Sequence, residues 1–242
     1  MKLNLIHFYP DLMNLYGSYA NLSVLRRMLE AMGNIVTVET VQPGQDIDLS
    51  DADFFFMGAG TERAQKAALA DFLRFGEAIK SAAESGCAML FCGTSMELLG
   101  KTVTDAEGQV YEGIGMADFT SVQGKKRFVE DVYGHTALYD APVVGFMNKC
   151  STLSGVETPL LTATDMGFGN EGKGSGEGFL WNNVIGSHLT GPLLVKNPRM
   201  LDAVVAAIYA RRNESLPAQL PRDEYAEAGY AVTAEQLKQR CK

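Results

Sequence analysis

The stretch Gly86-Cys87-Ala88-Met89-Leu90-Phe91-Cys92-Gly93-Thr94-Ser95 is an apolar strand pattern that passes through a glycine into the helical pattern of residues 96–100. A sharp strand-to-helix turn of this kind holds a nucleophilic side chain clear of a sheet and brings helix amides close to a developing oxyanion. Cys92, at the end of the strand pattern, is therefore the first candidate nucleophile. The alternative is structural, because a free cysteine on a core strand usually packs as a small hydrophobic side chain.

The residues before this stretch alternate between strand and helix patterns. Strands are predicted at 3–8, 35–41, 53–57 and 87–91, and helices at 21–32 and 61–83. Short apolar strands separated by helices long enough for crossovers predict an α/β fold with a mainly parallel central sheet flanked by helices. Ligands of such sheets bind beyond the carboxyl ends of the strands, where Tyr9-Pro10-Asp11, Gly58-Ala59-Gly60 and Cys92-Gly93 stand.

The second half of the chain has a different pattern. Residues 102–190 carry short β-type runs between glycine-rich turns, which predict short antiparallel additions to the sheet, and residues 166–178 form a substrate loop or a hairpin tip. A helix is predicted at 200–210. We therefore expect one domain over residues 1–212 and a C-terminal extension over residues 213–242 that ends in a short helix and packs on a partner.

Composition excludes several classes of function. The formal net charge of -8 argues against nucleic-acid binding, which requires a basic face. The four cysteines form no CxxC pair, so neither a disulfide framework nor a metal site is predicted. No apolar run approaches the ~20 residues that span a bilayer. These features predict a cytoplasmic protein with no membrane span. The one basic cluster, Lys125-Lys126-Arg127, is either a solvated turn or an anion site.

A series of motifs, in order and spacing, carries a family resemblance over residues 1 to about 212. The motifs are Tyr9-Pro10-Asp11-Leu12-Met13-Asn14-Leu15-Tyr16-Gly17, Gly58-x-Gly60, Cys92-Gly93 with Glu97-Leu98-Leu99-Gly100, Glu112-Gly113-Ile114-Gly115, Gly167-Phe168-Gly169-Asn170, Glu177-Gly178 and Gly186-Ser187-His188-Leu189-Thr190-Gly191-Pro192. On these motifs the chain resembles class I glutamine amidotransferases of the CobB/CobQ-like branch, and within it the GatD-like subunits. The resemblance implies a flavodoxin-like amidotransferase fold.

The resemblance also implies an activity and a set of site residues. A cysteine thiolate attacks the side-chain amide of glutamine, a histidine assists, and backbone amides stabilise the oxyanion. Carried onto this chain, Cys92 is the nucleophile, His188 the base, and the amides of Gly60 and Gly93 the oxyanion donors. Arg127 matches an arginine that helps to hold glutamine. No cofactor and no metal are implied, and the ammonia passes to a MurT-like Mur ligase in a heterodimer.

The chain departs from the family pattern at the histidine. The family has Gly-x-x-x-His-Gly-Pro, and here Thr190 stands at the position of the histidine. Threonine is no general base near neutral pH. His188 lies two residues earlier, on the same face of a strand and displaced by about 6 to 7 Å. It is therefore either a compensating base or a partly buried polar residue at the sheet edge.

A second departure concerns the turn. Counted forward from Gly86, the position of the family nucleophile falls on Cys92, but counted backward from Leu98-Leu99-Gly100 it falls on Gly93. We favour an insertion after the cysteine, which leaves Cys92 at the turn. In the other alignment the strand has slipped by one residue, which points the cysteine to the opposite face.

Two hypotheses follow from these departures. The first is an active amidotransferase subunit that hydrolyses glutamine and supplies ammonia to a Mur-ligase-like partner, which amidates lipid II or a related carboxylate. The second is a catalytically degenerate subunit with the same fold, which binds and scaffolds or regulates the ligase without glutaminase activity.

Overall fold

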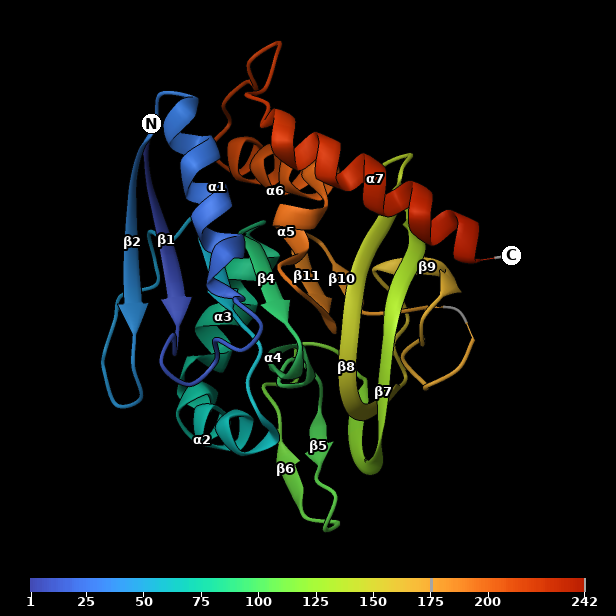
Figure 1. The fold of residues 1–242 in the computed structure, drawn as a ribbon. Coiled ribbons are helices and arrows are strands. Elements are labelled where there is room, and N and C mark those ends of the chain that lie inside the picture. The colour runs from blue at the N-terminus through green and yellow to red at the C-terminus, as the bar shows by residue number, and fades with distance from the viewer. Residues whose placement is uncertain (175, 242) are drawn as a thin grey trace.

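A six-stranded sheet forms the centre of the molecule in the computed structural model, which describes residues 1–174 and 176–241 (Figure 1). Its strands, in the spatial order β10-β11-β4-β3-β1-β2, are Phe179–Trp181, Val184–Ser187, Ala88–Cys92, Phe54–Met57, Lys2–Phe8 and Ile35–Val41. All neighbouring strands are parallel except β10 and β11, which are antiparallel. The predicted fold class, a mainly parallel sheet flanked by helices, is confirmed.

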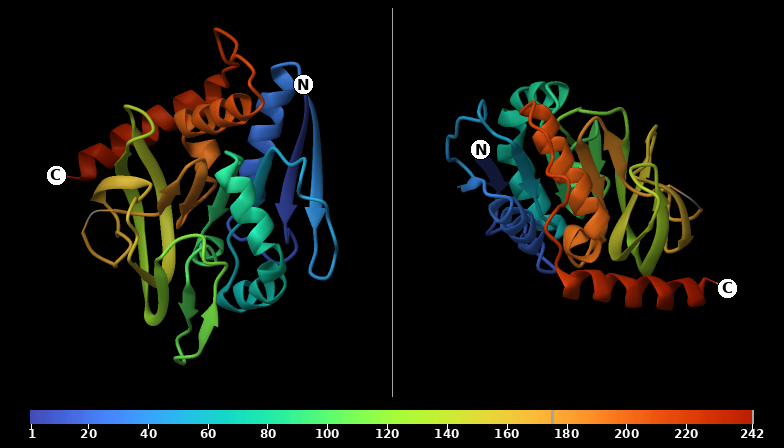
Figure 2. Two further views of the ribbon diagram at one scale, coloured as in Figure 1. Left: turned by 180° about the vertical axis from the view of Figure 1, so that it is seen from behind. Right: turned by 90° about the horizontal axis from the view of Figure 1, so that it is seen from above.

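Helices cover both faces of this sheet (Figures 1 and 2). The helices are α1 (Tyr19–Ala31), α2 (Glu62–Phe72), α3 (Gly76–Glu84), α4 (Thr94–Glu97), α5 (Leu193–Lys196), α6 (Pro198–Arg211) and α7 (Glu224–Arg240). One apolar core lies between the sheet and α1, α5 and α6, and a second lies between the sheet and α2 and α3. Strand side chains alternate between the two, because successive residues of a strand point to opposite faces. On β4, Leu90 and Cys92 enter the first core, and Met89 and Phe91 enter the second.

The helix predicted at 61–83 is interrupted. A 3-10 turn at Leu73–Phe75 separates α2 from α3. Arg74 in this turn donates hydrogen bonds to Asp71 and Asp46, which ties the turn to the loop after β2. The sequence does not reveal this interruption, because Phe72 and Phe75 are both buried and keep the apolar spacing of a continuous amphipathic helix.

A second sheet, in the order β12-β8-β7-β5-β6 with β9 also paired to β7, stands beside the first (Figure 1). Its strands are β5 (Thr102–Thr104), β6 (Val110–Glu112), β7 (Thr120–Thr136), β8 (Pro142–Ser154), β9 (Leu161–Met166) and β12 (Leu189–Thr190). This part is larger than the short additions that were predicted. The four residues 124–127 of β7 form a bulge opposite the single residue Cys150 of β8. These residues are a glycine and three consecutive cations, so they break the strand pattern in the sequence although β7 is one continuous strand.

The C-terminal segment packs on the second sheet of the same chain. Helix α7 crosses the end of β7 and β8 (Figure 1), where Leu237 packs against Tyr133 and Val144 and the Tyr230 hydroxyl donates to the carbonyl of Pro142. The helix is longer than the short tail that was predicted. No helix in residues 1–174 and 176–241 is long and apolar enough to cross a bilayer.

Candidate functional site

The turn between β4 and α4 is occupied by Gly93. Its backbone angles, φ 62° and ψ −133°, are those of a strained turn that glycine adopts without a steric penalty. A Cβ added to Gly93 would lie 3.8 Å from Cγ2 of Thr190 and only 2.7 Å from Cβ of Ala59. Gly93 and Thr190 therefore face each other at the carboxyl end of the central sheet, and the methyl group of Ala59 fills the space that a side chain at the turn would need.

Cys92 lies one residue before the turn and points the other way. Its side chain is 1% exposed within the core under α1, α5 and α6. The polar neighbour of its thiol is Nδ2 of Asn21, at 3.7 Å from Sγ, and the other end of that amide accepts a hydrogen bond from the backbone of Leu194. Burial, reinforced by the nearby Glu177 carboxylate, raises the pKa of the thiol above its usual range. The expectation that Cys92 stands at the turn is wrong, because the backbone turns at Gly93. Cys92 is still part of the strand, and strand alternation points its side chain into the core.

His188 is enclosed by acidic side chains. Its Nε2 lies 3.2 Å from Oε1 of Glu97 and 3.3 Å from Oγ of Ser151, and its Nδ1 lies 3.6 Å from Oε1 of Glu177. The imidazole and both carboxylates are at most 1% exposed. Among the described residues no hydrogen bond joins His188 to Cys92, so the predicted thiol and imidazole pair does not form. His188 is more deeply buried than the partly buried polar residue that one alternative described.

Glu97 accepts hydrogen bonds from several elements. Its donors include Nε2 of Gln65 at 2.9 Å, Oγ of Ser121 at 3.0 Å and Oγ of Ser151 at 2.6 Å. Although burial would raise its pKa, hydrogen bonding and electrostatic attraction from His188, with help from Ser151 and Gln65, lower the pKa of Glu97 to about 2. Glu97 is therefore an ionised carboxylate held in the interior.

Glu177 and Lys149 complete this buried polar cluster. Glu177 accepts from Oγ of Ser187 at 2.8 Å and from the backbone N–H of His188 at 2.7 Å. The Lys149 ammonium donates to the carbonyl of Gly169 at 2.9 Å, and burial lowers its pKa against the attraction of Glu177 and Glu97. The cluster joins the central sheet, α4, the second sheet and the loop before β10. Lys149 and Ser151 were not foreseen, since residues drawn from so many elements leave no signal in sequence spacing.

The two predicted oxyanion donors have partners within the chain. The N–H of Gly60 donates to the Thr94 hydroxyl at 3.1 Å, and the N–H of Gly93 donates to the carbonyl of Ser187 at 2.7 Å. The side chain of Met13, which is fully buried, packs directly against Gly60. The structure thus brings Gly60 and Gly93 to the same end of the sheet but leaves neither amide free to stabilise an anion.

Arg127 lies at the surface beside this region. Its Nε donates to Oδ1 of Asn148 at 2.8 Å and its Nη1 to Oε1 of Glu62 at 2.9 Å, while Nδ2 of Asn148 donates to the Tyr16 hydroxyl at 3.1 Å. Burial would raise the pKa of Glu62, but hydrogen bonds from its own backbone, the Cys150 thiol and Arg127 lower it. Arg127 is thus engaged by side chains of α2 and β8.

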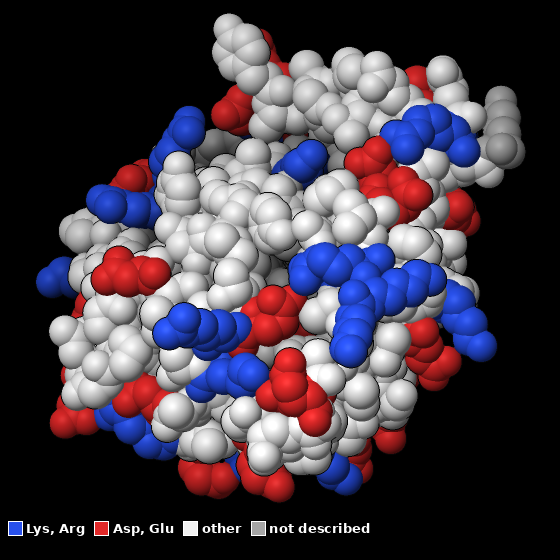
Figure 3. Space-filling view, turned by 60° about the horizontal axis from the view of Figure 1, so that its bottom comes forward, with Lys and Arg blue, Asp and Glu red and all other residues white. Residues whose placement is uncertain are grey.

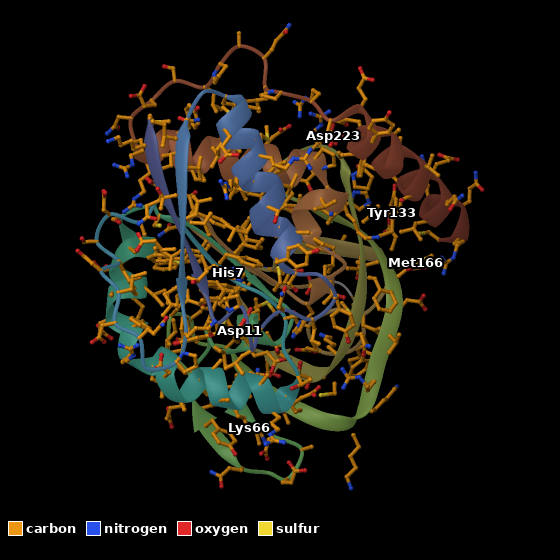
Figure 4. The ribbon with its side chains drawn as sticks, turned by 60° about the vertical axis from the view of Figure 1, so that its left-hand side comes forward. His7, Asp11, Lys66, Tyr133, Met166 and Asp223 are labelled. Atoms are coloured by element: carbon orange, nitrogen blue, oxygen red, sulfur yellow. The ribbon has the colours of Figure 1, made fainter. Side chains whose placement is uncertain are left out.

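A cleft of about 370 Å³ opens next to Arg127. It is lined by Glu62, Lys66, Ala106, Glu107, Gln123, Gly124, Lys125, Arg127 and Cys150. Figure 3 shows this end of the molecule, where cationic and anionic side chains lie side by side, and Figure 4 shows Lys66 reaching from α2 toward the β5–β6 hairpin, where it pairs with Asp105 at 2.8 Å. Burial and the Glu62 carboxylate raise the pKa of the Cys150 thiol to about 12, so this cysteine is a weak nucleophile.

Comparisons with known proteins agree with this architecture. The chain is 32% identical over 215 residues to the lipid II isoglutaminyl synthase (glutamine-hydrolyzing) subunit GatD of Streptococcus pneumoniae, covering 87% of this chain and 82% of that protein. It is 28% identical over 212 residues to the subunit of the same name from Staphylococcus aureus, covering 87% and 86%.

Solved structures share the fold at low identity. PurLQS from Thermotoga maritima superimposes with a TM-score of 0.55 at 12% identity over 87% of this chain and 99% of that one. A glutamine amidotransferase from the same organism gives a TM-score of 0.52 at 10% identity, covering 99% and 97%. The sequence profile of the CobB/CobQ-like glutamine amidotransferase domain matches residues 4–198. The chain therefore belongs to the CobB/CobQ-like glutamine amidotransferase domain family.

Proposed function

We propose that this chain is the amidotransferase-fold subunit of a carboxylate-amidating complex, and that it binds and scaffolds or regulates a Mur-ligase-like partner without hydrolysing glutamine itself. The observation that carries the proposal is that Gly93 and Thr190 face each other. In the alignment counted backward from Leu98-Leu99-Gly100, these are the positions of the family's cysteine and histidine. Neither side chain has a nucleophile or a base that acts near neutral pH.

Three further observations support a subunit without glutaminase chemistry. The Cys92 thiol is buried in the apolar core, the His188 imidazole is enclosed by two carboxylates, and the amides of Gly60 and Gly93 are already hydrogen-bonded. Thiolate attack requires access, a neighbouring base and free oxyanion donors. In this proposal the partner uses free ammonia, and lipid II or a related carboxylate is the acceptor, as the names of the relatives suggest.

The second candidate is an active glutaminase that uses Cys92 and His188. It is favoured by the 32% identity to a subunit that is named glutamine-hydrolyzing. This candidate requires the β4–α4 turn to rearrange when glutamine or the partner binds, so that the cysteine leaves the core.

One experiment separates the two candidates. The chain is purified with a MurT-like Mur ligase, and amidation of the acceptor is measured with ammonium or with glutamine as nitrogen donor. We expect amidation with ammonium only, at a rate that depends on the presence of this chain, and the same result for Cys92→Ala. Release of ammonia from glutamine by the wild type and its loss in Cys92→Ala would establish the second candidate instead.

A further inference from the structure

Strand β2 is an open edge of the central sheet. It is the last strand in the spatial order and pairs with β1 along its whole length, from Lys2 opposite Ile35 to Phe8 opposite Val41, without a register shift. In Figures 1 and 2 no other strand or helix of the described residues lies outside β2. A long, regular edge strand presents a row of unpaired backbone groups to another strand.

The composition of β2 leaves this edge unprotected. Its sequence is Ile-Val-Thr-Val-Glu-Thr-Val, in which six of seven residues are β-branched, with no proline, lysine or bulge. The one charge, Glu39, is turned back onto its own sheet, where its Oε1 accepts from Nδ2 of Asn4 at 2.6 Å. Ile35 is 65% exposed. Natural edge strands usually carry charges, prolines or bulges that prevent pairing, and β2 has none of these in an effective position.

The backbone hydrogen bonds fix which residues face outward. The N–H of Ile35 donates to the carbonyl of Met1, and the carbonyl of Val41 accepts from the N–H of Tyr9. The backbone N–H and C=O groups of the odd-numbered residues of β2 are therefore directed toward β1. Alternation then directs the N–H and C=O groups of Val36, Val38 and Thr40 away from the sheet.

This arrangement is complementary to itself. If two β2 strands pair antiparallel about Val38, Val38 lies opposite its own copy and Val36 lies opposite Thr40, so every outward-facing residue meets an outward-facing residue. In the same register Glu39 lies opposite Thr37 of the other copy, and no like charges are opposed. A two-fold contact requires a surface that matches its own copy in both hydrogen bonding and charge.

We propose that β2 is a homodimerisation surface, and that two copies of this chain pair antiparallel through it to form one continuous sheet. The contact lies at the opposite edge from β10 and β11, so it leaves the Gly93 end of β4 uncovered by the second copy's strand. The proposal is independent of whether the chain hydrolyses glutamine.

Sedimentation equilibrium of the full chain over a range of concentrations tests the proposal. We expect a reversible species of twice the chain mass. Thr37 is exposed, so charges are introduced there without disturbing the core. Thr37→Glu places a carboxylate opposite Glu39 of the other copy and weakens the dimer by about tenfold, whereas Thr37→Lys places an ammonium there and strengthens it by about tenfold.

A backbone variant provides the second arm. Thr40→Pro removes an outward-facing N–H that no intramolecular bond uses, and we expect it to abolish the dimer while circular dichroism shows the fold unchanged. If Thr40→Pro unfolds the chain, the opposite shifts of the two Thr37 variants decide the question. A monomer at all concentrations up to about 100 µM, or equal shifts for Thr37→Glu and Thr37→Lys, would overturn the proposal.

Discussion

A substitution at Gly93 tests whether the β4–α4 turn has room for a side chain. A residue other than glycine at φ 62° and ψ −133° costs about 1–3 kcal/mol in backbone strain. The new Cβ would also lie 2.7 Å from Cβ of Ala59, an overlap that costs another ~1–3 kcal/mol, as overpacking does. We therefore expect Gly93→Cys to lower the free energy of unfolding by about 2–6 kcal/mol, and Ala59→Gly in the same chain to restore about 1–3 kcal/mol of it.

The same position tests the chemistry. With Thr190→His added to Gly93→Cys and Ala59→Gly, a thiol and an imidazole would face each other across the gap that the structure shows between residues 93 and 190. We expect this triple variant to release ammonia from glutamine at least about 100-fold faster than the chain with Ala59→Gly and Gly93→Cys alone, since a positioned base contributes about that much.

Urea denaturation gives the stabilities, and an ammonia assay gives the rates. If Gly93→Cys is as stable as the wild type, or if Ala59→Gly restores no stability, residue 93 does not stand at a crowded turn facing Ala59.

Three other changes probe the buried groups. Cys92→Ala should lower the free energy of unfolding by about 1 kcal/mol and leave every activity of the complex unchanged, and thiol labelling of the native wild type should spare this cysteine until the chain unfolds. Glu62→Gln removes a carboxylate that raises the pKa of Cys150, so alkylation of Cys150 at pH 8 should become faster, and an unchanged rate would show that burial alone controls this thiol. The pKa of Glu97 is lowered to about 2 in the folded chain from an ordinary 4.5, so its stabilisation is complete above pH 4.5 and is lost as the pH falls toward 2. Glu97→Gln should therefore be less stable than the wild type by about 3 kcal/mol at pH 7, with a difference that shrinks below pH 4, and a difference independent of pH would contradict this account.

Periodicity predicted most of the central sheet. Strand Ile35–Val41 has the predicted bounds, and the other early strands and the helix predicted at 21–32 lie within about two residues of theirs, because short apolar runs and amphipathic helices carry strong local signals. The helix predicted at 61–83 is instead divided into α2 and α3. The long strand β7 was predicted only in part, since residues 124–127 bulge out of the ladder and break its pattern. Local pattern cannot show that Phe128 resumes the same strand after the bulge.

The candidate site was harder to predict for a different reason. Whether Cys92 or Gly93 stands at the turn depends on one residue of register, and both alignments satisfied the flanking motifs. The structure decides between them through the backbone angles of Gly93. The neighbours of His188 come from α4, β8 and the loop before β10, so no spacing in the sequence could reveal that this histidine is held between two carboxylates.

The cluster around Glu97 also limits how this chain can change over evolution. If His188 were lost alone, Glu97 would remain as a poorly compensated anion in the interior, and if Glu97 were lost alone, the donors of Gln65 and Ser151 would lack their acceptor. Each single loss carries the penalty of an unpaired buried group, whereas loss of the Thr190 hydroxyl removes one hydrogen bond, to the carbonyl of Phe146. The charged cluster therefore resists single substitutions on grounds of stability, and its persistence requires no catalytic role for His188.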